Sequence, residues 1–272
     1  MSTTNKPTDR ISVNEEYSRV ASAVLKTGAE LTCCGEATDE RDLYPPELRA
    51  ILPEGALSAC RGCGNPFNRV NLKPGLKVLD LGSGGGIDVL IAATKVAPAG
   101  HVTGLDMTDE MIELANENKK SAKIDNADFV KGYLEEMPFK DETFDVVISN
   151  CVINLCQDKR VVLAEALRVL KHGGAFVVTD IVLDSDKFTP EQVLGVGSIL
   201  GCTSGVLNRC DYINMMNEVG FNSVDIDAYS HFSYEHLVER SVDKGLEKEL
   251  EPFSKDDVHE IFASAYVSGI KK

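Results

Sequence analysis

Tryptophan is absent from this chain, and aromatic residues make up only 6% of its 272 residues. Basic residues are also scarce, because 28 Lys and Arg stand against 43 Asp and Glu and leave a net charge of −15. A phosphate backbone requires a basic protein face, so nucleic acid is an unfavourable partner. No apolar run approaches the roughly 18 residues of a membrane span, and residues 1–10 lack the apolar core of a signal peptide. We therefore expect a cytoplasmic protein that binds neither membrane nor nucleic acid.

Short apolar runs alternate with amphipathic segments from residue 76 onwards. Strands are predicted over residues 77–81, 101–105, 128–130, 144–149, 175–182, 223–229 and 261–270. Helices are predicted over residues 87–96, 109–122 and 158–170, and a helical region over residues 189–219. This alternation is typical of α/β proteins, and we expect a doubly wound, mostly parallel sheet of seven strands.

The texture of the sequence divides the chain into three expected regions. Residues 1–70 show no strand pattern, contain a predicted helix over residues 13–27, and form a cysteine-bearing N-terminal cap. Residues 71–185 form the core. Residues 186–272 provide a helical insertion after the fifth strand and the C-terminal strands that complete the sheet.

The first predicted strand ends in Asp80, and glycines follow at alternate positions, Gly82, Gly84 and Gly86. Glycine allows backbone conformations and a close approach to a ligand that a Cβ atom would prevent. The spacing differs from the dinucleotide fingerprint, because Ile87 stands where the third glycine of that pattern belongs. S-adenosylmethionine carries a cationic sulfonium and has no pyrophosphate, so an acid before the loop suits it.

Ligands of doubly wound sheets bind at the carboxyl ends of the strands. Asp106 ends the second strand and is placed to hold both ribose hydroxyls, and Glu135 follows the third strand, where an adenine edge can be read. Asn150 ends the fourth strand, where its amide can contact the ligand near the methyl group. The predicted cofactor-binding residues are Asp80, Gly82, Ser83, Gly84, Gly86, Asp106, Met107, Leu134, Glu135 and Asn150. The arrangement over residues 76–182 resembles the class I methyltransferases, which implies S-adenosylmethionine as the methyl donor.

The chain has eight cysteines, although structural disulfides are rare in a reducing cytoplasm. Only Cys60 and Cys63 have the spacing of a zinc knuckle, and a closed zinc site needs four ligands. Cys63, Cys151 and Cys202 are predicted on separate elements that can converge. Three thiolates hold trivalent arsenic as a pyramid, and its lone pair can attack a methyl group without a general base. The five histidines share no predicted sheet end, so we expect them to be surface or cap residues and not ligands.

Several motifs resemble those of the arsenite methyltransferases. They are Leu57–Pro66 (LSACRGCGNP), Asp80–Asp88 (DLGSGGGID), Gly104–Met111 (GLDMTDEM) and Ser149–Leu155 (SNCVINL), within a resemblance that covers about residues 13–230. The resemblance implies that Cys63, Cys151 and Cys202 bind As(III), and that a relay cysteine falls on Cys33 or Cys34. It also implies methyl transfer to thiolate-bound arsenite and methylarsenite, a thioredoxin or glutathione reductant, and no permanent metal.

Two alternatives remain open at this point. The chain can be a methyltransferase for a small organic acceptor in which the thiols are incidental, but three separated thiols argue against this reading. It can also be a metalloid- or zinc-binding protein with a regulatory nucleotide site, but the intact glycine loop argues against that one. Cys60 is either a relay thiol or a spare one, whereas Cys156 and Cys210 are predicted to be packing residues.

Overall fold

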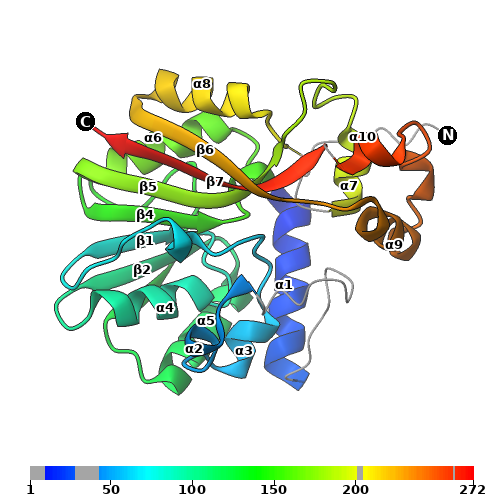
Figure 1. Cartoon of the computed structure of the whole chain (residues 1–272). Coiled ribbons are helices and arrows are strands. Elements are labelled where there is room, and N and C mark those ends of the chain that lie inside the picture. Colours follow the sequence, from blue (N-terminus) through cyan, green and yellow to red (C-terminus); the bar gives the residue numbers. More distant parts are fainter. Residues whose placement is uncertain (1–9, 28–42, 201–204, 260) are drawn as a thin grey trace.

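The computed structural model describes residues 10–27, 43–200, 205–259 and 261–272 of the chain. Its described residues form one seven-stranded sheet with helices around it (Figure 1). The strands are β1 (Lys77–Leu81), β2 (His101–Asp106), β3 (Ala127–Lys131), β4 (Phe144–Asn150), β5 (Leu170–Leu183), β6 (Phe221–His231) and β7 (Phe262–Lys271). The strand order is β3-β2-β1-β4-β5-β7-β6. β7 runs antiparallel to β5 and β6, whereas the other pairs are parallel. The predicted doubly wound, mostly parallel seven-stranded fold is confirmed.

Helices lie before and between the strands, and the helices predicted over residues 13–27, 87–96, 109–122 and 158–170 are present with small differences in their bounds. The described α-helices are α1 (Arg10–Thr27), α2 (Pro46–Arg49), α3 (Glu54–Ser58), α4 (Ile87–Val96), α5 (Asp109–Ala122), α6 (Lys159–Val169), α7 (Leu194–Leu200), α8 (Arg209–Val219), α9 (Tyr234–Lys244) and α10 (Lys255–His259). Short 3₁₀ turns lie at η2 (Pro66–Asn68), η3 (Ile153–Leu155) and η4 (Glu247–Glu249). None of the helices in the described part of the chain is long and apolar enough to cross a membrane.

The central strands bury side chains on both faces of the sheet, because neighbouring residues of a strand point in opposite directions. Val78 and Val102 belong to a hydrophobic cluster that includes the apolar side of α4. Leu79 and Leu105 lie an odd number of positions further along the same strands and belong to a cluster that includes α6 and α8. Helices on both faces therefore explain why β1 and β2 are almost continuously buried.

The junction between α6 and β5 differs from the prediction. The helix was expected to reach residue 170 and to stop at the glycines of residues 171–174, but α6 ends at Val169. Leu170 is extended, fully buried and paired with Phe144 of β4, so the chain enters the sheet at once. Gly173 adopts a φ of 77° inside β5, next to the register shift between β4 and β5. The glycines thus serve an irregularity of the strand and not a helix end.

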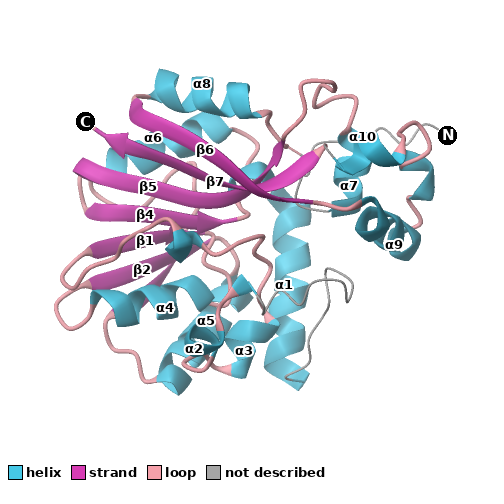
Figure 2. Ribbon diagram, viewed as in Figure 1, coloured by secondary structure: helices cyan, strands magenta, loops and turns pink. Residues whose placement is uncertain are grey.

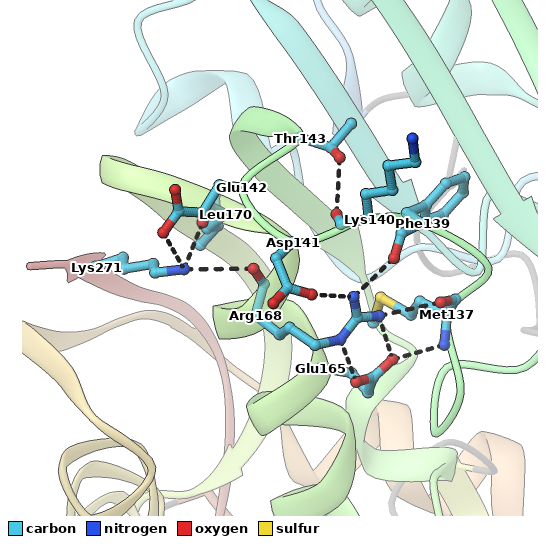
Figure 3. A network of polar contacts seen from close by, with 10 residues as sticks. All are labelled: Met137, Phe139, Lys140, Asp141, Glu142, Thr143, Glu165, Arg168, Leu170 and Lys271. Atoms are coloured by element: carbon cyan, nitrogen blue, oxygen red, sulfur yellow. Dashed lines mark hydrogen bonds and ion pairs between the residues drawn. The ribbon is translucent and has the colours of Figure 1, made fainter.

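One arginine fastens the connection between β3 and β4 to α6 (Figure 3). Arg168 donates to the carbonyl oxygens of Phe139 at 2.7 Å and Met137 at 3.0 Å. Both carboxylate oxygens of Glu165 bind the same guanidinium, at 2.6 and 2.7 Å, a bidentate pair of the strong kind. Glu165 also accepts the Met137 N–H at 2.7 Å. The connection also contains residues 134 and 135, so this network holds part of the site described below.

The helices outside the sheet layers gather at one end of the molecule (Figure 2). α7 and α10 contact α9 there, and α1 contacts α3 and α5. β1 and β4 finish near α1, because Gly82 and Val152 line a cavity together with Tyr17 of that helix. The strand order reverses between β1 and β4, which is where doubly wound sheets bind their ligands.

Candidate active site

The loop after β1 uses glycine for conformation and for space. Gly82, Gly84 and Gly86 have φ values of 66°, 49° and 89°, in the left-handed region that favours glycine. A Cβ at Gly82 would lie 2.6 Å from the side chain of Val152. Gly86 begins α4, and a Cβ there would lie 2.7 Å from the ring of Phe129. The alternate glycines therefore follow from the path of the backbone.

Asp106 at the end of β2 fixes this loop. Its Oδ2 accepts the N–H of Gly84 and its Oδ1 accepts the N–H of Thr108, both at 2.9 Å. Burial raises the pKa of Asp106, and the backbone N–H groups act in the opposite direction. Thr108 occupies the N-cap of α5 as predicted, but its side chain makes no capping bond. The carboxylate of Asp106 instead binds the N–H of Thr108 itself.

Two connected cavities surround the glycine loop. The first, called the α1 cavity, is lined by Arg10, Val13 and Tyr17 of α1 together with Asp106, Met107, Leu134, Glu135, Cys156 and others. The second, called the glycine-loop cavity, is lined by Asp80, Ser83, Asp88, Met111, Asn150 and others. Tyr17, Gly82, Gly84 and Val152 line both. The two cavities therefore adjoin each other along the glycine loop.

Acidic and basic side chains both line the glycine-loop cavity, the acids Asp80 and Asp88 and the base Arg61. Burial, with the nearby charge of Asp88 and then that of Asp106, raises the pKa of Asp80 well above its usual range. Burial also raises the pKa of Asp88 to about 6. The buried hydroxyl of Ser83 has no hydrogen-bond partner among the described residues. Carboxylates and an unused donor are a suitable set for a ligand with a sulfonium and an amino-acid tail, so the residues present fit S-adenosylmethionine.

A third cavity, called the thiol cavity, holds two of the predicted arsenic-binding cysteines. Its volume is about 410 Å³, and Cys63 from the cap and Cys151 from the end of β4 both line it. Arg61 and Gly62 line the thiol cavity and the glycine-loop cavity alike. The two thiols therefore lie beside the loop at which a methyl donor would bind.

Cys151 has an unusual backbone. Its φ is 63°, which is uncommon for a residue with a side chain, and its N–H donates to the carbonyl oxygen of Thr179 at 2.8 Å. The residue is almost fully buried. Left-handed conformations of this kind persist where surrounding contacts impose them, and they concentrate at functional sites. The turn directs the chain away from β4 immediately after Asn150.

The predicted cofactor residues lie together, with one exception. Nine of the ten line the α1 or the glycine-loop cavity, and Gly86 lies behind the loop at the start of α4. Glu135 forms an ion pair with Arg10. The Asn150 amide binds the cap segment that contains Cys63, a use that sequence reasoning did not foresee.

The cysteines separate into distinct environments. Cys33, Cys34 and Cys202 lie outside the described residues. Leu200 at the end of α7 lines the thiol cavity. Cys60 is buried and lines the glycine-loop cavity. The other two are apart from the thiol cavity, since Cys156 lines the α1 cavity and Cys210 is exposed on α8.

Two of the histidines lie nearer to the thiols than their spread through the sequence suggests. His231 at the end of β6 and His236 in α9 both line the thiol cavity. Their position could not be predicted from local patterns, because these elements follow the core by many residues, and β6 joins the sheet through β7, which pairs it to β5. His231 is 2.8 Å from Asp184, and burial lowers the pKa of His236.

The sheet, the glycine loop and the acid at the end of β2 define a class I methyltransferase. The family model described as a methyltransferase domain matches residues 72–263. The chain is 37% identical to the arsenite methyltransferase of Halobacterium salinarum over 226 residues, which are 79% of this chain and 57% of that one. It is 36% identical to the human arsenite methyltransferase over 213 residues, 73% of this chain and 55% of that one.

A solved structure agrees with these relatives. The crystal structure of an arsenic(III) S-adenosylmethionine methyltransferase from Chlamydomonas reinhardtii matches with a TM-score of 0.65 and 31% identity, over 84% of this chain and 74% of that one. This chain belongs to the arsenite methyltransferase family. It spans a little more than half the length of the two curated relatives.

Proposed function

We propose that this chain transfers a methyl group from S-adenosylmethionine to trivalent arsenic held by the thiolates of Cys63, Cys151 and Cys202. The observation that carries the proposal is that Cys63 and Cys151, 88 positions apart in the sequence, line one cavity beside the glycine loop. The names of the relatives support arsenite as the acceptor. Cys202 enters through the sequence resemblance alone, because it lies outside the described residues.

The thiolates prepare arsenic for the transfer. S-adenosylmethionine supplies a methyl group on a positively charged sulfur. Thiolates replace the oxygen ligands of arsenite and leave the lone pair of arsenic free, because soft ligands bind soft centres well. The lone pair forms a bond to the methyl carbon while the carbon–sulfur bond breaks and leaves its electron pair on sulfur. No proton moves in this step, so the site needs no general base.

Acidic side chains around the glycine loop favour methyl transfer from a cationic donor. Asp80 and Asp88 line the glycine-loop cavity and Asp106 lines the α1 cavity, and a cationic methyl donor nearby favours their charged forms. The donor loses its sulfonium charge when the methyl group leaves. The carboxylates then bind the neutral sulfur of the product less well, which favours exchange for a new donor.

Methyl transfer changes the oxidation state of arsenic. Methylation formally takes two electrons from arsenic and makes it pentavalent. Two enzyme thiolates that join as a disulfide return these two electrons, and Cys33 or Cys34 is our proposed relay partner on the basis of the resemblance. Thioredoxin or glutathione then reduces the disulfide, which the potential of a reducing thiol pool permits.

Product analysis tests the function directly. The purified chain is incubated with arsenite, methyl-labelled S-adenosylmethionine and a thiol reductant, and the arsenic species are separated. We expect labelled methylarsenic from the wild type and at least a hundredfold less from Cys63→Ser, Cys151→Ser and Cys202→Ser. Cys210→Ser is the matched control, since Cys210 is exposed on α8 and lines none of the three cavities. Label in a small organic acceptor, with no methylated arsenic, would overturn the proposal in favour of an organic substrate.

A further inference from the structure

The segment Gly62-Cys63-Gly64 is held between two side chains that come from different strands. On one side, Asn150 at the end of β4 binds the backbone of Cys63 and Gly64. On the other side, the Tyr229 hydroxyl of β6 donates to the carbonyl oxygen of Cys63 at 2.9 Å. The N–H and the carbonyl oxygen of Cys63 are therefore both bound by side chains from the sheet.

The amide of Asn150 is used on both of its atoms. Its Oδ1 accepts the N–H of Cys63 at 3.0 Å, the N–H of Gly64 at 3.3 Å and the hydroxyl of Thr179 at 2.7 Å. Its Nδ2 donates to the carbonyl oxygen of Gly64 at 2.7 Å and to the Tyr44 hydroxyl at 3.1 Å. Asparagine offers a donor and an acceptor on one planar group, and this position requires both.

The residues on either side of Cys63 must be small, because Asn150 and Tyr229 closely approach the backbone there. A Cβ at Gly62 would overlap the amide of Asn150, and a Cβ at Gly64 would overlap the hydroxyl of Tyr229. Neither glycine has a positive φ, so space and not conformation explains them. Glycine at both positions therefore allows Asn150 and Tyr229 to contact the backbone on either side of Cys63.

Asn150 also connects this segment to the glycine-loop cavity. The Tyr44 hydroxyl, which accepts from Asn150, donates to Asp88 Oδ1 at 2.8 Å, and Nδ2 of Asn150 lies 3.3 Å from Asp88 Oδ2. Asp88 belongs to the first turn of α4, directly after the glycine loop. The Asn150 side chain therefore contacts both the Cys63 segment and the start of α4, and the next residue in the chain is Cys151, the second thiol of the cavity.

We propose that Asn150 is a positioning residue that sets the Cys63 thiol opposite the Cys151 thiol for arsenic binding, with Tyr229 as its counterpart on the other side of the segment. The inference rests on the proposed function in that arsenic is the ligand that the two thiols share. Asn150 acts through the Cys63 backbone and not on the arsenic itself. Loss of its amide releases the Cys63 segment without removing either thiol.

Arsenite affinity and thiol bridging test this together. Arsenite binding is measured by calorimetry, and dibromobimane, which joins two neighbouring thiols, is used to bridge Cys63 to Cys151, with the bridged peptides identified by mass spectrometry. Several hydrogen bonds are lost in Asn150→Ala, so we expect arsenite affinity and the yield of the bridge to fall by about tenfold or more. Tyr229→Phe loses one bond to the segment, and we expect a fall of about threefold.

Thr179→Val is the matched control, since it removes one bond to the same Oδ1 and leaves those to Cys63 and Gly64 in place. We expect S-adenosylmethionine affinity to stay within about twofold in Tyr229→Phe and Thr179→Val, because a general loss of structure would lower it. Asn150 itself lines the glycine-loop cavity, so the fold of Asn150→Ala is checked by circular dichroism instead. Unchanged arsenite affinity and bridging in Asn150→Ala and Tyr229→Phe, with binding lost in Cys63→Ser, would overturn the inference. If the wild type does not bind arsenite, the proposed function fails, and the dependence of the bridge on Asn150 still decides the positioning role.

Discussion

Arg10 of α1 and Glu135 after β3 form an ion pair, with Nη2 and Oε1 3.1 Å apart, and both residues line the α1 cavity. The guanidinium of Arg10 also lies over the ring of Tyr133, 4.6 Å from its centroid. These contacts join the N-terminal helix to the connection that Arg168 fixes on α6. The helix thereby closes one side of the cavity in which we place the adenosine half of the methyl donor.

Substitution of Arg10 should weaken donor binding. In Arg10→Ala, α1 loses its charged contact with residues 133–135, and we expect the dissociation constant for S-adenosylmethionine to rise by about threefold to tenfold at low salt, with a smaller rise at high salt. Arg19→Ala is the matched control, because Arg19 pairs with Glu16 on the same helix and lines none of the cavities. Calorimetric titration of both variants at two salt concentrations is the measurement. Equal effects of the two substitutions would assign the change to the helix as a whole.

The hydroxyl of Ser83 offers a second test of the donor site. It is buried without a partner among the described residues, and it lines the glycine-loop cavity. A bound donor can use this hydroxyl, so Ser83→Ala should weaken S-adenosylmethionine binding by about threefold to tenfold. The ligand-free variant should unfold at the same temperature as the wild type or slightly above it, because an unpaired buried polar atom has been removed.

Ser58 provides the control for Ser83. Its hydroxyl is likewise buried and without a partner in the described part of the chain, but it lines none of the three cavities. Ser58→Ala should affect ligand-free stability in the same direction as Ser83→Ala and leave donor binding unchanged. The comparison uses thermal unfolding without ligand and calorimetry with ligand. An identical loss of donor affinity in both variants would contradict a direct contact from Ser83.

The glycine loop and Asp106 could be predicted from the sequence because their signals are local. Strand period, glycine spacing and the acid after the next strand all lie within about thirty residues, and strand ends meet at the same edge of a parallel sheet. β1 and α4 have the predicted bounds, and β2 differs by one residue. The pattern needs no information from distant parts of the chain.

The hydrogen bonds that hold Cys63 could not be predicted, because they join residues that lie far apart in the sequence. Asn150 reaches Cys63 across 87 positions and Tyr229 reaches it across 166. The same limit applies to His231, which meets the thiol cavity only after β6 has joined the sheet through β7. Gly-Cys-Gly was the one available signal, and it indicates a close approach without naming the partner.

The thiol of Cys156 should react slowly with alkylating reagents although it lines a cavity. Burial, with the charge of Glu135 as a smaller cause, raises the pKa of its thiol to about 12, and only the thiolate is an effective nucleophile. We expect iodoacetamide at about pH 8 to leave Cys156 largely unmodified while Cys210, which is exposed, reacts. Peptide mass spectrometry over a time course measures both sites in one sample. Modification of Cys156 at the rate of Cys210 would show that the α1 cavity is open to reagents and that burial does not protect the thiol.

The pH dependence of stability should carry a contribution from Asp180 of β5. Burial raises the pKa of Asp180 to about 7, whereas an unfolded aspartate titrates near 3.9. Its Oδ1 accepts from Asn154 at 2.8 Å and from the N–H of Ile181 at 3.0 Å, but Oδ2 is buried without a partner among the described residues. Lys159 lies near enough to favour the charged form in part.

The sign of the effect follows from proton binding. Between about pH 4 and pH 7 the folded state holds a proton on Asp180 that the unfolded state has lost, so the unfolding free energy falls as the pH rises through this window. Asp180→Asn is neutral at every pH and keeps an oxygen for Asn154 and Ile181. The free energy of unfolding of the variant relative to the wild type should therefore increase from pH 5 to pH 8, by a few kcal/mol.

Urea denaturation of the two proteins at several pH values measures this difference, and the shared pH dependence of Asp80 and Asp88 cancels in it. Asp145→Asn is the control of opposite sign. Although partial burial acts against it, hydrogen bonds from Lys171 and from the N–H of Lys77 lower the pKa of Asp145. Its stabilising effect is present at neutral pH and is lost as the pH falls through the folded pKa. A difference between Asp180→Asn and wild type that stays constant from pH 5 to pH 8 would mean that Asp180 is charged in the folded protein throughout, with Lys159 as its effective partner.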